Sequence, residues 1–586
     1  MDPIRYTLSF TAPHTHYVEV RAEVPTSGQS EVELMMAVWT PGSYLIREYE
    51  RHVEHVAATG SGSTALSVTK SAKNRWVVAT GGADAVILTY RVYGREMSVR
   101  TNWIESGFAL INGAPTFLTL ADSHARPHEV TVMLHSSWTR VMTALPPLAD
   151  KEHSFRAATY DMLVDSPILI GSPAVHAFEI DGRIHRLANE GEAGVFDGAR
   201  AARDLESIAR EQHRFWGSIP YRSYVCLNLM TESGGGLEHC DSAVLMTSRW
   251  ATRTRKAYVG WLELASHELF HVWNGKRLRP FALGPFDYER EVHTRSLWVV
   301  EGITDYYGDL LLHRAGLTTR EEFLASLSNK IDALQTTPGR AVHSIINASF
   351  DAWIKFYRPD ENSPNTSISY YIKGSVVAFL LDARIRRVSS GRRSLDDVMR
   401  VAYEKYSGER GYSDQEFRAV VEEVARARFE SFWSSVLEGT GELEYAEALD
   451  TLGLRFKTAE PEMGKTPRKA TLGAVMKIDG GRLVVSQIRR GTPGHEAGLN
   501  VDDELLAIDD FRVRPDQLDA RMEQYVAGDR VSLLVARRDR LISLDVVLGA
   551  EPSKSWQLEV DPSATAGQRA GLDFWLAPSG NPVRTG

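Results

Sequence analysis

The first 170 residues alternate apolar and polar positions with a period of two, which is typical of half-buried β-strands. Turn residues separate the alternating runs, as in Pro25-Thr26-Ser27-Gly28. The runs lie at residues 6–10, 16–24, 31–34, 86–93 and 129–134. This pattern predicts an antiparallel, β-sandwich-like domain over residues 1–170.

The period changes near residue 195, where apolar positions begin to recur at helical spacing. Residues 199–215 fit an amphipathic helix, and the next apolar runs predict strands at 224–230 and 242–246. Helical patterns continue from residue 319 to about 460, and Ser413 opens one of them with a capping box. Together these elements predict an α+β domain whose helices follow a small sheet.

The last part of the chain contains a smaller compact unit. Residues 454–467 have the Pro- and Gly-containing composition of a linker, and the strand patterns that follow mark a unit over 468–550. Residues 551–586 are expected to form a partly ordered tail that docks through Trp556, Phe574 and Trp575. The expected fold class is therefore multidomain α+β, with domains over residues 1–170, 171–460 (sheet part 171–250, helical part 251–460) and 468–550.

Composition excludes some classes of function. The net charge of −9 argues against nucleic acid as the main partner. A transmembrane helix needs about 20 apolar residues, and no run approaches that length. The first residues lack a signal peptide, so the chain as written is expected to be cytoplasmic, or periplasmic or secreted if a leader was trimmed. Cys226 and Cys240 are expected to be free thiols, although their spacing permits a bridge.

Residues 261–274 form an apolar run without Pro or Gly that predicts a buried helix. His267 and His271 lie one turn apart on it, so their imidazoles project together, with Glu268 beside them. Two imidazoles supply half of a zinc site, and the adjacent carboxylate can take a proton from bound water. A chance copy of this motif would usually lie on a polar, exposed helix, because burying these groups without a partner is costly.

A second apolar helix, at residues 296–307, carries Glu301 and Asp305 on one face. A metal held by two histidines needs a third protein ligand, and Glu301 has the right character. Asp305 could accept a hydrogen bond from the outer nitrogen of a ligand histidine and fix its tautomer. The alternative for Asp305 is an ion pair with a nearby arginine.

Three more stretches allow both a structural and a functional interpretation. Gly235 and Gly236 precede Glu238 and either let the backbone approach a ligand or form a plain hairpin loop. Tyr370 and Tyr371 enter a helix, where tyrosines more often belong to the core. The turn at residues 39–44 either packs beneath a loop or lines a cleft.

Several of these segments resemble one group of enzymes. Residues 267–275 resemble the H-E-x-x-H-x-W-x-G helix of gluzincin aminopeptidases, and residues 298–302 resemble their third-ligand helix. Residues 235–239 resemble their G-x-M-E-N motif, with Leu for Met and His for Asn, and residues 371–374 resemble their Tyr-x-Lys-Gly motif. Residues 491–508 resemble a PDZ domain, whose carboxylate-binding loop would be 471–474.

One family combines these parts, namely the PDZ-containing glycyl aminopeptidases. The resemblance implies a thermolysin-like catalytic domain with one zinc ion per chain, held by His267, His271 and Glu301. It implies that Glu268 is the general base, that Tyr371 stabilises the oxyanion, with Tyr370 as the alternative, and that Glu238 in its glycine-rich strand binds the substrate ammonium. The implied reaction removes Gly or Ala from peptides with a free N-terminus, and a C-terminal peptide would bind the PDZ domain.

Two other functions remain open at this point. The same metal site could serve an endopeptidase in which Glu238 is structural. Alternatively, the chain could be a non-catalytic protein whose PDZ unit captures C-termini. Cleavage of N-terminally blocked and free peptides distinguishes an endopeptidase from an aminopeptidase. An amidase assay distinguishes an enzyme from a non-catalytic binding protein.

Overall fold

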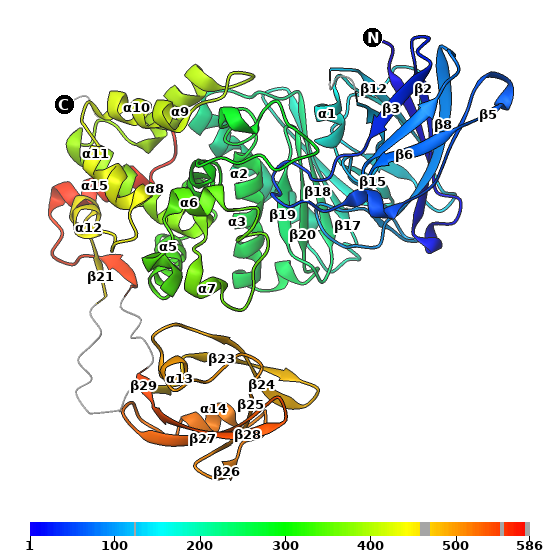
Figure 1. The fold of residues 1–586 in the computed structure, drawn as a ribbon. Coiled ribbons are helices and arrows are strands. Elements are labelled where there is room, and N and C mark those ends of the chain that lie inside the picture. Colours follow the sequence, from blue (N-terminus) through cyan, green and yellow to red (C-terminus); the bar gives the residue numbers. More distant parts are fainter. Residues whose placement is uncertain (122–124, 458–468, 551–555, 581–586) are drawn as a thin grey trace.

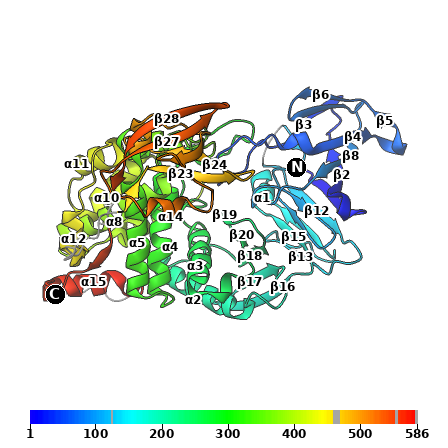
Figure 2. The same ribbon diagram turned by 90° about the horizontal axis from the view of Figure 1, so that it is seen from below.

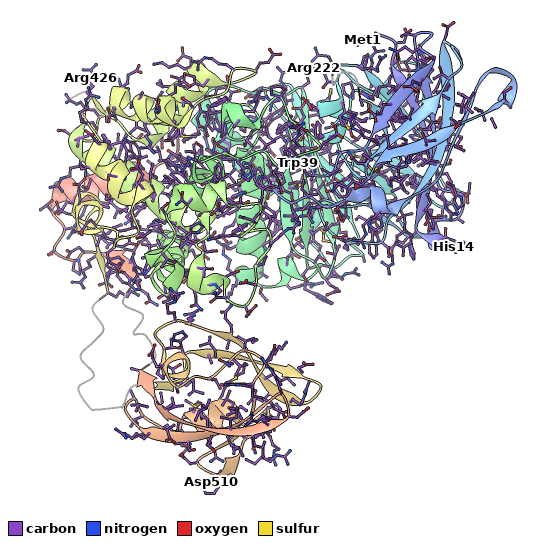
Figure 3. All side chains as sticks on the ribbon, viewed as in Figure 1. Met1, His14, Trp39, Arg222, Arg426 and Asp510 are labelled. Atoms are coloured by element: carbon purple, nitrogen blue, oxygen red, sulfur yellow. The ribbon has the colours of Figure 1, made fainter. Side chains whose placement is uncertain are left out.

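The computed structural model describes residues 1–121, 125–457, 469–550 and 556–580. A sheet-rich N-terminal part adjoins a mainly helical part, and a smaller C-terminal unit lies beside the helices (Figures 1 and 2). Trp39 is fully buried and lies near the centre of the molecule, between the two larger parts (Figure 3). This arrangement agrees with the expected multidomain α+β class, with a sheet-rich N-terminal domain followed by a helical one.

The N-terminal part is built on two sheets that share one apolar core. Inward residues alternate with outward ones, so that Ile4, Tyr6 and Leu8 are buried while Arg5 is exposed. The first sheet has the order β14 (Ser154–Ala157), β12 (His128–Met133), β1 (Ile4–Ser9), β2 (Tyr17–Pro25), β8 (Ala85–Tyr93), β4 (Val53–Thr59) and β5 (Ala65–Leu66). The second has the order β11 (Thr119–Leu120), β3 (Glu31–Met35), β7 (Arg75–Ala79) and β6 (Val68–Ala72). The expected all-antiparallel pairing is wrong at one place, because β12 returns to lie parallel to β1.

Two further sheets connect this part to the helices. One has the order β13 (Arg140–Met142), β15 (Ile168–Gly171), β10 (Ala109–Ile111) and β9 (Trp103–Ile104). The other has the order β16 (Ala174–Ile180), β17 (Arg183–Glu190), β18 (Ser223–Met230), β20 (Ser242–Thr247) and β19 (Gly235–Glu238). Leu110 and Leu169 of the first sheet share an apolar cluster with Leu227 and Val244 of the second, so the two parts are packed together.

The helical part surrounds α3 (Arg255–Phe270), which is buried as its apolar sequence predicts. It packs against α2 (Gly198–Trp216), α4 (Ile303–Arg314) and the strands β19 and β20. Gln212, which interrupts the apolar stripe of α2, is buried and donates to the Ser266 carbonyl at 2.8 Å. The predicted later helices are present as α5 (Arg320–Gln335), α8 (Tyr370–Val388) and α10 (Asp414–Ala425), which Ser413 caps.

The tail docks through Trp575 and Trp556 as expected, but it is helical, and the first linker positions form a strand. Leu454–Phe456 form strand β21, which pairs with β30 (Leu558–Val560), and the remaining linker positions 458–467 lie outside the described residues. The following helix α15 (Ala566–Leu576) buries Trp575 completely in the core of the helical part. The apolar side chains of this segment thus belong to the main core, and the unit at 469–550 is an insertion between β21 and β30.

The inserted unit has its own apolar core and one main sheet. The strand order is β23 (Ala474–Asp479), β24 (Arg482–Ile488), β25 (Glu504–Ile508), β27 (Arg530–Arg537) and β28 (Arg540–Val547). It contacts the helical part through Asn365 of α7 (Ser363–Thr366), whose amide donates to the Ile488 carbonyl at 2.8 Å and accepts from the Arg490 N–H at 2.7 Å. Among the described residues no helix is long and apolar enough to cross a membrane, and Cys226 and Cys240 are free thiols.

Candidate active site

The helix α3 brings His267 and His271 together near its C-terminal end. Their Nε2 atoms are 3.0 Å apart, His271 is fully buried, and His267 is partly exposed. The Nδ1 atom of His271 lies 2.9 Å from the Asn274 carbonyl, so Nδ1 donates this hydrogen bond and Nε2 is the nitrogen that faces His267. Asn274, whose role the sequence did not indicate, also donates to the Val299 carbonyl at 2.8 Å and ties the two helical segments together.

Glu301 lies on η6 (Trp298–Gly302), a turn of π-helix that leads into α4. Its Oε2 atom is 3.1 Å from His271 Nε2 and 3.6 Å from His267 Nε2. The glycine at position 302 lets η6 touch α8, because a Cβ there would lie 2.4 Å from Gly374 Cα. Turns of π-helix occur frequently at functional sites, and this one turns the Glu301 carboxylate toward both imidazoles.

The three side chains fit a tetrahedral metal ion. Ligands about 2.1 Å from a tetrahedral zinc ion lie about 3.4 Å from one another, and the three pairs here are separated by 3.0, 3.1 and 3.6 Å. Burial alone would raise the pKa of Glu301, but the neighbouring imidazoles lower it to about 2, so its carboxylate is ionised. Two nitrogens and one carboxylate oxygen are the donor set of many catalytic zinc sites.

Glu268 lies beside this set and is 5% exposed. One carboxylate oxygen, Oε2, is buried without a hydrogen-bond partner. Burial raises the pKa of Glu268 to about 7, although the two imidazoles oppose the rise. A Cβ on Gly236 would come within 2.1 Å of the Glu268 Oε1 atom, so only glycine fits there. The carboxylate is therefore able to take up and release a proton near neutral pH.

Asp305 is not in hydrogen-bonding contact with His267. Its Oδ1 atom is 4.0 Å from His267 Nδ1, and Lys330 holds its Oδ2 atom at 2.7 Å. Lys330 also pairs with Asp309 at 2.8 Å. Asp305 thus lies behind His267, as expected from its spacing. Its close partner is Lys330, whereas the alternative prediction was an ion pair with an arginine.

Glu238 is the last residue of β19, an edge strand that pairs antiparallel with β20. The plain hairpin loop considered for this stretch is wrong, because β18 and β20 run parallel and β19 lies beyond them. Glu238 is 7% exposed, and one of its oxygens lies within 4.8 Å of ligand atoms of Glu268 and His271. The N-terminal part approaches it at Gly42, where a Cβ would lie 2.5 Å from Glu238 Oε1.

A buried ion pair fixes the residues that follow Glu238. Asp165, from the N-terminal part, accepts from Lys276 at 2.6 Å and contacts His239 Nδ1 at 3.0 Å. It also accepts from the Cys240 N–H at 2.8 Å. Burial would raise the pKa of Asp165, but Lys276 and His239 hold it well below its usual range. His239, which replaces the Asn of the resembled motif, therefore faces Asp165.

Of the two tyrosines at the start of α8, Tyr371 lines the cavity and Tyr370 does not. Tyr370 is completely buried, and its hydroxyl forms no hydrogen bond of ordinary geometry with any described residue. The ring of Tyr371 stacks near His267, with ring centroids 6.1 Å apart. Burial raises the pKa of Tyr371 well above its ordinary value, so its hydroxyl stays protonated and can donate a hydrogen bond.

One cavity of about 360 Å³ is lined by Glu238, His267, Glu268, His271, Glu301, Asp305 and Tyr371. Gly42 and Arg100, from loops of the N-terminal part, also line it, and the sequence did not indicate Arg100. The 39–44 turn combines both interpretations considered for it, since Trp39 packs against Trp353 while Gly42 lines the cavity.

Comparisons with known proteins agree with this arrangement. The family description "Peptidase M61 N-terminal domain" matches residues 5–172, and "M61 glycyl aminopeptidase" matches residues 260–377. No curated protein matches the chain. A crystal structure of an aminopeptidase N family protein from Idiomarina loihiensis is 29% identical, with a TM-score of 0.90 over 98% of this chain and 100% of that one. A crystal structure of a variant M1 zinc metallopeptidase from Deinococcus radiodurans is 15% identical, with a TM-score of 0.48 over 76% and 95% of the two chains.

Proposed function

The chain belongs to the M61 peptidase family, and from this premise we propose that it is a zinc aminopeptidase that releases small N-terminal residues, Gly and Ala first, from peptides. The observation that carries the proposal is the convergence of His267, His271 and Glu301 beside the unpartnered oxygen of Glu268. When bound to these three ligands, one zinc ion would act as a Lewis acid toward a water molecule and the scissile carbonyl.

In the proposed reaction Glu268 accepts a proton from the attacking water and later transfers a proton to the leaving amine. Its raised pKa, about 7, suits both steps. Tyr371 donates its hydroxyl hydrogen to the oxyanion that develops on the former carbonyl. Because its pKa lies far above neutral, the hydroxyl enters the reaction as a donor.

Glu238 would bind the free ammonium group of the substrate. Its carboxylate forms no hydrogen bond or ion pair within the described residues and lies close to His271 and Glu268. A charge-assisted hydrogen bond at this distance from the metal ligands would place the first peptide bond, and no later one, at the reacting centre. The resulting enzyme would be an exopeptidase.

The inserted unit is proposed to be a PDZ domain that binds a peptide C-terminus. Strand β23 pairs only with β24 in the described sheet, so its outer edge is free to add a peptide strand. Gly473, in the proposed carboxylate-binding loop, has φ = +69°, and a Cβ there would lie 2.2 Å from Thr492 Cβ.

A substrate panel tests the catalytic proposal. Purified protein should hydrolyse glycyl and alanyl anilides faster than bulkier aminoacyl anilides, lose this activity with a chelator and regain it with zinc. N-acetylated peptides should resist cleavage. Glu238→Gln should reduce kcat/KM for free glycyl substrates at least about 100-fold. Equal hydrolysis of acetylated and free peptides would contradict the aminopeptidase assignment.

A further inference from the structure

Most charged side chains around the catalytic cavity have a partner of opposite charge. Glu301 contacts both imidazoles, and Lys330 pairs with Asp305 and Asp309. Three carboxylates of the cavity, Glu238, Glu263 and Glu268, form no ion pair in the described part of the chain. The proposed function makes Glu268 the general base and assigns Glu238 to the substrate ammonium.

Arg100 is the one lysine or arginine lining this cavity that has no ion pair among the described residues. Its side chain lines the cavity and is partly buried, and its Nε atom is shielded from solvent without a hydrogen bond. The guanidinium forms no hydrogen bond or ion pair with any residue that the structure describes, Glu238 included. A guanidinium held partly away from water in this way is stabilised by an anion, and a carboxylate can bind it with two parallel hydrogen bonds.

The loop that carries Arg100 is fixed before any ligand binds. Its carbonyl accepts a hydrogen bond from the buried Tyr49 hydroxyl at 3.0 Å. On one side the Thr101 hydroxyl donates to the Glu96 carbonyl at 2.7 Å, and on the other Asn112 donates to the Thr101 carbonyl at 2.7 Å. A group held by such bonds loses little conformational entropy when it binds a ligand.

A neighbouring cation strengthens the need for an anion here. Burial lowers the pKa of Arg47, and the charge of Arg100 lowers it further, so the two guanidinium groups are close enough to repel each other. Arg47 is held by the Ser43 hydroxyl at 2.8 Å and does not line the cavity. An anion bound at Arg100 would reduce this repulsion.

One cavity thus contains an unpaired carboxylate and an unpaired guanidinium that are too far apart to pair with each other. Its volume of about 360 Å³ lies at the small end of the range for ligand pockets, which leaves room for only a few residues. A ligand that matches both groups is a small molecule with an ammonium group at one end, for Glu238, and a carboxylate at the other, for Arg100.

We propose that Arg100 is a specificity-determining residue that binds a carboxylate on the leaving side of the substrate, so that the enzyme favours short peptides with a free carboxylate over longer or amidated ones. This inference rests on the proposed aminopeptidase function and on Glu238 binding the ammonium group. The carboxylate is either the C-terminus of a di- or tripeptide or an acidic side chain after the scissile bond.

The test compares glycyl-alanine with glycyl-alanine amide in the wild-type chain and in Arg100→Gln. We expect wild-type kcat/KM to be at least tenfold higher for the acid, mainly through a lower KM. Arg100→Gln should reduce this ratio to within threefold, and Arg100→Lys should retain part of it. Glycyl p-nitroanilide, which has no carboxylate, should be hydrolysed at rates within threefold of wild type by both variants.

A matched control is Arg95→Gln. Arg95 belongs to the same segment but stacks on Trp103 outside the cavity, with its guanidinium carbon 4.0 Å from the ring centroid. This variant removes the same charge and should keep the wild-type preference for the acid. A second comparison, glycyl-aspartate amide against glycyl-asparagine amide, distinguishes a side-chain carboxylate from the C-terminal one.

The inference is overturned if the wild-type enzyme treats acids and amides alike in both comparisons. It is also overturned if Arg100→Gln lowers turnover of the acid and the amide by the same factor. Failure of the proposed function itself gives a different result, because the wild-type protein would then not hydrolyse glycyl p-nitroanilide at all.

Discussion

At the scale of single residues, three potential metal ligands converge on one point. His271 donates from Nδ1 to the Asn274 carbonyl, so its Nε2 atom faces the Nε2 atom of His267, 3.0 Å away. The ionised Glu301 lies 3.1 Å from the same nitrogen. Two imidazole nitrogens and a carboxylate at these distances can share one cation.

Glu268→Gln removes the group that accepts the water proton and leaves the three metal donors in place. We expect kcat on glycyl p-nitroanilide to fall by about 10²–10⁴-fold, the usual contribution of a positioned general base. Zinc content, measured by atomic absorption, should remain at one ion per chain. A variant with near-normal turnover would show that another residue accepts the proton.

The adjacent tyrosines provide an internal comparison. Tyr371→Phe removes a donor that lines the cavity, and kcat should fall by about 10²–10³-fold, as when other oxyanion donors are removed. Tyr370→Phe removes a buried hydroxyl that forms no hydrogen bond of ordinary geometry with any described residue and should change kcat by less than threefold. If Tyr370→Phe is the inactive variant instead, the hydroxyl that donates to the oxyanion is that of Tyr370 and not that of Tyr371.

At the scale of elements, the position of the proposed metal ligand Glu301 depends on a close crossing of η6 and α8. Gly374 faces Gly302 so closely that a Cβ at position 374 would lie 2.7 Å from Gly302 Cα. The crossing places Glu301 on one segment and Tyr371 on the other beside the same cavity. Glycine on both sides is what permits this approach between helical backbones.

Gly374→Ala should push these segments apart by several tenths of an ångström and displace Glu301, although residue 374 touches neither the metal ligands nor the substrate. We expect at least a tenfold weaker affinity for zinc, measured by competition with a chelator, and a loss of about 1–3 kcal/mol in stability. Gly260→Ala on the exposed side of α3 meets no atom within 4 Å and should bind zinc as the wild type does. Equal affinities in both variants would contradict the role assigned to the crossing.

The sequence could predict those parts of the site that lie within one element. The spacing of His267 and His271 on an apolar helix predicted their convergence, and the next apolar helix pointed to Glu301. The hydrogen bonds of Asn274 could not be predicted, and the sequence left two interpretations of the 39–44 turn open, since both depend on contacts between distant segments. The same holds for Arg100, because a lone arginine in a loop carries no pattern.

At the scale of the whole molecule, the chain leaves the helical part at β21 and returns to it at β30. Trp575 was placed in a tail on the basis of Pro and Gly content, yet it is fully buried in the main core. Local composition could not reveal this because strand pairing between residues 454–456 and 558–560 spans the inserted unit. The unit is therefore held at both ends of its sequence and, in addition, by Asn365.

Asn365→Ala removes two hydrogen bonds to the backbone of the inserted unit and leaves the Arg490 N–H without its acceptor. The Ile488 carbonyl is buried, and an unsatisfied buried group costs about 1–3 kcal/mol, so the unit should separate from the helical part more readily. Small-angle scattering should show a larger radius of gyration, and limited proteolysis should release the unit faster. Asn347→Ala on the exposed side of α6 (Ile345–Phe350) is the control and should behave as the wild type.

The claim on which the account depends is that His267, His271 and Glu301 bind one zinc ion. X-ray diffraction from crystals of the zinc-loaded protein, measured on both sides of the zinc absorption edge, tests it most directly. The account predicts one strong anomalous peak per chain, about 2.1 Å from the two Nε2 atoms and the Glu301 carboxylate. A peak elsewhere, or none at this place in zinc-loaded crystals, would contradict it.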